Sequence, residues 1–143
     1  MTTIPLEPVD AVSITSIVDN VSDMLLLDQG PAKRPSMSGS RVDRIPAAFL
    51  EGGSIADPLK AEHGFSALIS VTKEGTTHNV LFDAGISPDG VTENMRRLEF
   101  NPKDIEAIVL SHGHFDHTTG MDGIVKGLGG TAKLPVLIHP EFW

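Results

Sequence analysis

The sequence contains no cysteine, and this absence excludes several kinds of chemistry. Without thiols the chain cannot build a disulfide framework, a thiolate zinc site or a cysteine nucleophile. Basic residues are also scarce, because 11 Lys and Arg stand against 19 Asp and Glu and give a formal net charge of −8. Proteins bind the phosphates of nucleic acids mainly through Lys and Arg, so this balance argues against a general nucleic-acid surface.

Long apolar runs are missing as well. No stretch approaches the length of a membrane span, and the N-terminus lacks the basic and apolar regions of a secretory signal peptide. We therefore expect a soluble cytoplasmic protein without a membrane partner. The 143 residues suit one domain, and a hydrophobic content of 40% is sufficient for its core.

The order of the predicted elements is that of an α/β protein. Strands are predicted over residues 12–18, 65–71, 79–82, 105–110 and 134–138, the second and third as an antiparallel hairpin and the last as a buried strand. Helices are predicted over 88–98 and 118–128, the latter interrupted by Gly120 and Gly123. Residues 28–63 contain too much Pro and Gly for long regular elements, which predicts a long loop or lid within the domain.

Three histidines and one aspartate lie within six consecutive positions, directly after the strand predicted over 105–110. Residues two apart in an extended chain point to the same side, so His112 and His114 can reach one metal ion together. Asp116 and His117 follow where the chain bends toward a helix, and they can face a neighbouring ion. The pattern predicts a site for two ions, zinc or alternatively iron or manganese. The alternative is a cluster of polar surface residues in a turn.

The His-x-His-x-Asp-His pattern of residues 112–117 resembles the signature of the metallo-β-lactamase-fold hydrolases. A second segment, Leu81 to Gly85, resembles the first motif of that superfamily. Its aspartate, here Asp83, supports the metal-binding loop from behind the ligands. Three shorter segments resemble one branch of the superfamily, the proteins similar to dihydropterin-phosphate synthases; they are residues 18–20, 62–66 and 138–140.

The resemblance implies the N-terminal half of an αββα sandwich, with a mixed sheet and helices on one face. In a complete member, a further histidine, a bridging aspartate and a last histidine come from segments beyond the first half. The chain ends at Trp143, so four ligands are expected to be present and about three absent. We expect the domain of residues 1–143 to be incomplete at its C-terminus, and to form a homo-oligomer or to associate with a chain that supplies the C-terminal half.

The resemblance also implies a metal-dependent hydrolase that attacks a small-molecule substrate with a metal-bound hydroxide. His112 and His114 would hold the first ion, and Asp116 and His117 the second. Asp116 is also placed to orient the nucleophilic water and carry its proton, which makes it the candidate catalytic residue. Two alternatives stay open: a metal-dependent enzyme of pterin biosynthesis, and a catalytically incomplete metal-binding fragment that needs a partner chain.

Other polar residues are candidates for the substrate pocket. His63 lies at the end of the long loop, where a pocket role and a purely structural role are both open. His139 is assigned to the pocket rim because it follows the last predicted strand. His78 is interpreted as an ordinary surface residue. Four cations of the long loop could attract an anionic substrate or stay solvated; they are Lys33, Arg34, Arg41 and Arg44.

Overall fold

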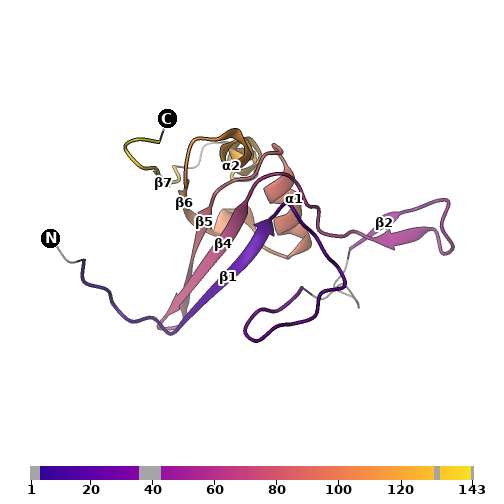
Figure 1. Cartoon of the computed structure of the whole chain (residues 1–143), viewed down its shortest axis with the longest axis horizontal. Coiled ribbons are helices and arrows are strands. Elements are labelled where there is room, and N and C mark those ends of the chain that lie inside the picture. Colours follow the sequence, from indigo (N-terminus) through magenta and orange to yellow (C-terminus); the bar gives the residue numbers. More distant parts are fainter. Residues whose placement is uncertain (1–3, 36–42, 131–132, 143) are drawn as a thin grey trace.

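A five-stranded mixed sheet forms the centre of the computed structural model, which describes residues 4–35, 43–130 and 133–142 (Figure 1). In spatial order the strands are β1 (Ala11–Val18), β4 (Ser66–Lys73), β5 (Thr76–Phe82), β6 (Ile105–Val109) and β7 (Val136–Leu137). β4 runs antiparallel to both of its neighbours, β1 and β5, whereas β5, β6 and β7 run parallel to one another. The predicted α/β class with a mixed sheet is confirmed.

The hairpin of β4 and β5 is the element that local sequence determines most directly. Its two-residue turn consists of Glu74 and Gly75, with φ of 50° and 78°, and Lys73 pairs with Thr76 across it. Positive φ at both central residues matches the right-handed twist of the strands and fixes their register. The predicted antiparallel hairpin is therefore confirmed, and its strands are longer than the prediction had them.

Helices connect the parallel strands and cover one face of the sheet. The connection from β5 to β6 contains α1 (Gly90–Arg97) and the 3-10 helix η1 (Pro102–Asp104). The connection from β6 to β7 contains α2 (Phe115–Thr118) and α3 (Met121–Gly127). Both connections advance in the same direction across the sheet, so their helices lie on one side, and α1 packs against α3. Within the described ranges no helix is long and apolar enough to span a membrane.

The hydrophobic core lies between these helices and the sheet. Leu68, Leu81 and Ile108 stand side by side on three neighbouring strands and are at most 2% exposed. From the helical side, Met95 of α1 and Ile124 of α3 complete this layer and are fully buried. The packing of this core thus fixes the order of the strands, and that order determines which residues meet at the carboxyl edge of the sheet.

The opposite face of the sheet is apolar but open. Ile14, Ile69, Val80 and Ala107 form one row across four strands. Ile14 is 70% exposed, and the other three are only half-buried. A row of this kind is a surface that soluble proteins normally cover.

Two predicted elements of the C-terminal region are wrong in detail. In the helical region predicted over 118–128, the interruption at Gly120 is confirmed, but the first helix already begins at Phe115 and Gly123 lies inside α3 without interrupting it. The predicted final buried strand is the two-residue edge strand β7, whose Val136 and Leu137 are 44% and 53% exposed. Its side chains are exposed because it pairs with a neighbour along only one of its edges.

Close backbone contacts explain why glycine occupies positions 120 and 123. A Cβ at Gly120 would lie 1.8 Å from the carbonyl oxygen of Ala84, and one at Gly123 would lie 1.9 Å from that of Pro88. Both distances are far inside van der Waals contact, so only glycine allows α3 to approach the loop after β5. The loop carrying Asp83 is therefore held directly against the helical layer.

The long segment 28–63 contains one small hairpin, formed by β2 (Arg44–Pro46) and β3 (Ser54–Ala56), which projects beyond the main sheet (Figure 1). An ionic cluster fixes its base to α1. Asp57 binds Nε of Arg97 at 3.0 Å and Nη2 of Arg96 at 2.5 Å, and Arg96 also binds Asp43. That the segment acts as a lid stays a prediction.

We expect this cluster to make stability depend on acid. Burial alone would raise the pKa of Asp57, but hydrogen bonds from Arg97 and Arg96 outweigh it and hold the pKa below 3.8. A depressed folded pKa contributes stability above the unfolded value of about 3.9, and this contribution is lost as the pH falls through the lower folded value. Asp57→Asn should therefore cost about 2 kcal/mol at pH 7, measured by urea unfolding, and much less at pH 3.

Asp43→Asn is the matched control, because Asp43 binds the same Arg96 with a side chain that is 64% exposed. Exposed ion pairs contribute about 0–1 kcal/mol, so this change should matter little at either pH. If the difference between wild type and Asp57→Asn were equal at pH 7 and pH 3, the proposed role of the Asp57 carboxylate would be wrong.

Candidate metal centre

The histidine-rich motif lies at the carboxyl edge of the parallel strands. Leu110 still donates a backbone hydrogen bond to Leu137, and the chain then leaves the sheet and begins α2 at Phe115. His112 and His114 therefore lie in the connecting loop, whereas Asp116 and His117 lie in the first turn of the helix. Figure 1 shows α2 beyond the end of β6.

The three imidazole rings of the motif lie together. The ring centre of His112 is 4.5 Å from that of His114 and 4.3 Å from that of His117, so His112 stands between them. His112 and His117 are half-buried, and His114 is exposed. The loop thus gathers side chains that the sequence placed two and three residues apart.

Asp83 connects the ends of β5 and β6. It has a φ of 57° and is 1% exposed, and its own N–H donates to the carbonyl oxygen of Val109. One carboxylate oxygen accepts the backbone N–H of Ser111 at 2.7 Å. The other accepts the Ser111 hydroxyl and Nδ1 of His117, both at 2.7 Å. Three hydrogen bonds thus hold Asp83 behind the motif, where the sequence analysis expected it.

These hydrogen bonds determine which ring nitrogens are free. Because the Asp83 carboxylate accepts, Nδ1 of His117 carries a proton, and in the neutral ring Nε2 is the nitrogen with a lone pair. The Ser111 hydroxyl donates its hydrogen to Asp83, so at 2.9 Å it accepts from Nδ1 of His112. In the neutral ring of His112, Nε2 is likewise the nitrogen with a lone pair. A histidine ligand commonly has its second nitrogen bound in this way.

Asp116 lies between two imidazoles. Its Oδ2 is 3.5 Å from Nε2 of His117 and 3.4 Å from Nε2 of His63, which comes from the end of the long segment. The Asp116 side chain is 16% exposed and that of His63 is 74% exposed. The structure therefore brings His63 to the motif, whereas the sequence left its role open.

The chemistry of this donor set fits a divalent metal ion. Neutral imidazole nitrogens and a carboxylate are ordinary ligands of zinc, and iron and manganese accept similar sets. The donor atoms themselves, however, are not arranged as a complete metal site. Across residues 4–35, 43–130 and 133–142, no three His, Asp or Glu side chains are arranged so that they could hold one ion. The four predicted ligands are neighbours without surrounding a common point.

The remaining candidates lie apart from these contacts. His139 follows β7 at the same edge, and its Nδ1 accepts the backbone N–H of Glu141 at 3.1 Å. Lys33 pairs with Asp28 at 3.3 Å, and Arg34 donates to the carbonyl oxygen of Leu26. The surface hollow that Lys33 and Arg34 line together contains none of the predicted ligands.

The sequence analysis also named two other cations of the long loop and one surface histidine. Arg44 donates to the Ser54 hydroxyl at 2.9 Å within the small hairpin, and Arg41 lies outside the described residues. His78 is exposed and pairs with Glu106 across β5 and β6, at 2.9 Å. It is a surface residue, as the sequence predicted.

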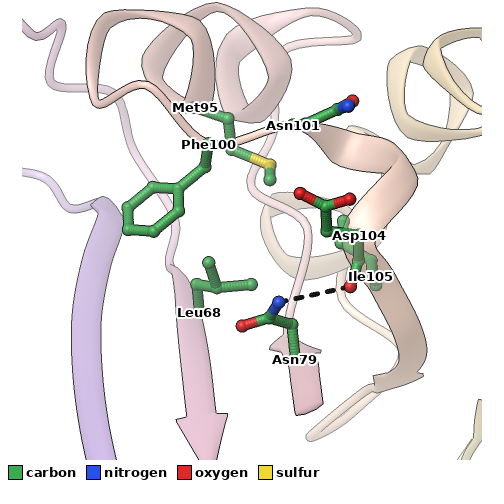
Figure 2. A pocket seen from close by; sticks show the side chains of 7 residues that line it. All are labelled: Leu68, Asn79, Met95, Phe100, Asn101, Asp104 and Ile105. Carbon is green, nitrogen blue, oxygen red and sulfur yellow. Dashed lines mark hydrogen bonds between the residues drawn. The ribbon is translucent and has the colours of Figure 1, made fainter. Parts of the chain in front are cut away.

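A small internal cavity lies elsewhere in the molecule. It has a volume of about 20 Å³, and Figure 2 shows its lining, which includes Leu68, Met95 and Asp104. Asn79 points across it and donates to the carbonyl oxygen of Asp104 at 3.3 Å. A space of this size holds about one water molecule, and none of the predicted ligands lines it.

Sequence reasoning missed two residues that organise the centre. Ser111 joins Asp83 to His112, and its only signal was its place directly before the first histidine. Glu62 accepts the backbone N–H groups of Ile86 and Ser87 at 3.0 and 3.1 Å, which holds the end of the long segment against the loop after β5. No sequence pattern indicates that contact, because its partners are 24 and 25 residues away.

Comparison with known proteins identifies relatives for this arrangement. The profile of the family described as the metallo-beta-lactamase superfamily matches residues 60–143, more than half of the chain. A 7,8-dihydropterin-6-methyl-4-(beta-D-ribofuranosyl)-aminobenzene-5'-phosphate synthase of Methanocaldococcus jannaschii is 40% identical over 109 residues, which are 75% of this chain and 36% of that protein. A ribonuclease Z of Treponema pallidum is 40% identical over 78 residues, 54% of this chain and 23% of that protein.

Solved structures give a more distant likeness. A metallo-beta-lactamase of Cronobacter sakazakii is 23% identical, with a TM-score of 0.44, over 59% of this chain and 28% of that one. The chain thus spans about a third of the length of the pterin-related synthase and about a quarter of the ribonuclease.

Proposed function

This chain belongs to the metallo-beta-lactamase superfamily, and we propose that it is a metal-dependent hydrolase whose ligands include His112, His114, Asp116 and His117. The observation that carries the proposal is the hydrogen bonding of Asp83. It fixes the tautomer in which Nε2 of the neutral His117 ring can bind metal and, through Ser111, does the same for His112. A surface histidine cluster would not need a buried carboxylate to set the protonation of its rings.

Each residue then has a distinct task. His112 and His114 hold one ion, and Asp116 and His117 hold a second; zinc suits this set best, and iron and manganese are alternatives. When bound, such ions lower the pKa of a coordinated water to about 7 and polarise the substrate oxygen. The Asp116 carboxylate would also accept a hydrogen bond from the attacking water and orient it toward the substrate. Asp83 and Ser111 hold the rings in place.

A second candidate function is an enzyme acting on a phosphorylated pterin. It is favoured by the identity of 40% with the Methanocaldococcus synthase, which extends over 75% of this chain. Lys33 and Arg34 would then bind the phosphate, since cations recognise it through charge-assisted hydrogen bonds. The other relative, a ribonuclease, acts on a substrate for which the net charge of −8 provides little attraction.

The open apolar face of the sheet is relevant to the binding of partners. We propose that the row from Ile14 to Ala107 is covered by a further αβ layer, which also carries additional ligands. The partner that covers the row is either a second copy of this chain or a chain that supplies the C-terminal half.

Metal binding and turnover test the proposal together. We expect calorimetric titration with zinc to show two ions per chain, and we expect hydrolysis within a panel of chromogenic esters, lactams and phosphodiesters. The double variant His112→Gln/His114→Gln should lose one ion and the turnover. Turnover of a pterin phosphate alone would favour the second function, and weak zinc binding without turnover would favour a fragment that needs a partner. A chain that takes up no zinc would contradict the metallohydrolase assignment.

A further inference from the structure

The outer edge of β1 lacks the features that usually protect the edge of a sheet. β1 is the last strand on its side and has eight residues, none of them proline or charged (Figure 1). At the opposite edge, β7 has only two residues, and Pro135 and Pro140 lie close to its ends. Short strands, prolines and charges are the means by which proteins prevent an edge from pairing further. The β1 edge is therefore open to another strand.

The strand register shows which backbone groups face this edge. Lys73 and Thr76 flank the two-residue turn between β4 and β5, and residues in that position exchange hydrogen bonds across the hairpin. The N–H and C=O groups of Lys73 therefore point toward β5. Because this direction alternates from one residue to the next, every second residue of β4, beginning with Thr72, directs these groups toward β1.

Those residues of β4 pair with residues 11, 13 and 15 of β1. The backbone groups of Val12, Ile14 and Ser16 consequently point away from β4 and into the open edge. The side chains beside them are exposed as well, Val12 by 57% and Ile14 by 70%. The edge thus offers unpaired backbone groups and apolar side chains together.

An antiparallel strand can be complementary to a second copy of itself. Regular pairing in β1 begins at Ala11, and the register shifts between Ser16 and Val18, so Ile14 lies near the centre of the regular stretch. A twofold axis at Ile14 places this residue opposite its own copy and Val12 opposite Ser16 of the second copy. Each of these pairs then joins residues whose backbone groups point outward, and each can exchange two hydrogen bonds.

We propose that β1 pairs antiparallel with β1 of a second copy of this chain, about a twofold axis at Ile14. The two sheets then become one, and the apolar row from Ile14 to Ala107 continues without a break into the same row of the second copy. β1 brings no charged side chain to this contact, although each copy has a net charge of −8. The contact involves no metal ligand and is independent of the proposed function.

Introduced thiols test the register, because the chain has no cysteine of its own. Residues in a hydrogen-bonded antiparallel pair have Cα atoms about 5.5 Å apart, which suits a disulfide, so Ile14→Cys should form a covalent dimer under mild oxidation. Val12→Cys and Ser16→Cys should not do so alone, because each thiol lies about 13 Å from its copy. A mixture of these two variants should form the mixed dimer, since positions 12 and 16 face each other.

The backbone contact is tested without thiols by sedimentation over a wide concentration range. Ile14→Pro removes the N–H at the axis, whereas Ile14→Ala shortens the side chain and keeps it. Proline is tolerated in an edge strand where its nitrogen faces solvent, and thermal unfolding confirms that both variants are folded. We expect wild type to dimerise reversibly, and Ile14→Pro to associate about tenfold or more weakly than Ile14→Ala.

Three results would overturn the inference. Wild type could remain a monomer at every concentration. Folded Ile14→Pro could associate as strongly as Ile14→Ala, which would place the contact on the open face of the sheet instead of its edge. Val12→Cys or Ser16→Cys alone could form disulfides as fast as Ile14→Cys, which would exclude the axis at Ile14. If Ile14→Pro does not fold, the thiol variants decide. All these measurements are made without metal, so the proposed hydrolase function stands or fails separately.

Discussion

Asp83→Asn is expected to lower zinc affinity about 10- to 100-fold while the fold is retained. The backbone N–H of Ser111 can only donate, so the amide oxygen must take the place of Oδ1. The NH₂ group then takes the place of Oδ2 and faces both the Ser111 hydroxyl and Nδ1 of His117. His117 then shifts its proton to Nε2 and loses the lone pair that binds metal. Asparagine adopts the left-handed conformation of this position, with φ of 57°, as readily as aspartate.

Zinc titration measures the expected loss of affinity, and thermal unfolding without zinc measures whether the fold is retained. Asp83→Ala should lower both affinity and stability, because it leaves three hydrogen-bonding groups of Ser111 and His117 without their partner. Asp122→Asn is the control, since Asp122 is an exposed residue of α3 whose side chain pairs with Lys126. Unchanged zinc affinity in Asp83→Asn would mean that Asp83 does not set the protonation of the ligands.

Gly123→Ala is expected to destabilise the protein by about 3 kcal/mol. In an isolated helix this substitution would be favourable by about 0.5–1 kcal/mol. Here the new Cβ would lie 1.9 Å from the carbonyl oxygen of Pro88, a backbone atom that cannot turn away as a side chain could. Either α3 or the loop after β5 must move, and that movement disturbs the layer that holds Ile124 in the core.

Gly127→Ala provides a matched control in the same helix. A Cβ there would lie 3.5 Å from Pro102, which is ordinary van der Waals contact, so only the gain in helix propensity remains. Urea unfolding should therefore show a lower midpoint for Gly123→Ala and an equal or higher one for Gly127→Ala. Equal stability of the two variants would show that the contact between α3 and Pro88 is not tight.

Local patterns in the sequence were sufficient for the elements whose cause is local. The hairpin of β4 and β5 follows from apolar strands on either side of a two-residue turn ending in Gly75. The strand before the motif and helix α1 follow from hydrophobic spacing, and the density of histidine and aspartate over residues 112–117 predicted a metal site without any structure.

The continuity of α3 through Gly123, the exposure of β7 and the arrangement behind the ligands were decided only by the tertiary structure. Glycine is required at positions 120 and 123 by backbone atoms that lie 36 and 35 positions earlier, and the local sequence does not show these contacts. Asp83 reaches Ser111 and His117 across 28 and 34 residues, and His63 reaches Asp116 from the end of the long segment. Such contacts depend on which strands become neighbours and in what register, because short-range spacing constrains only the conformation of a segment and not the partner it meets.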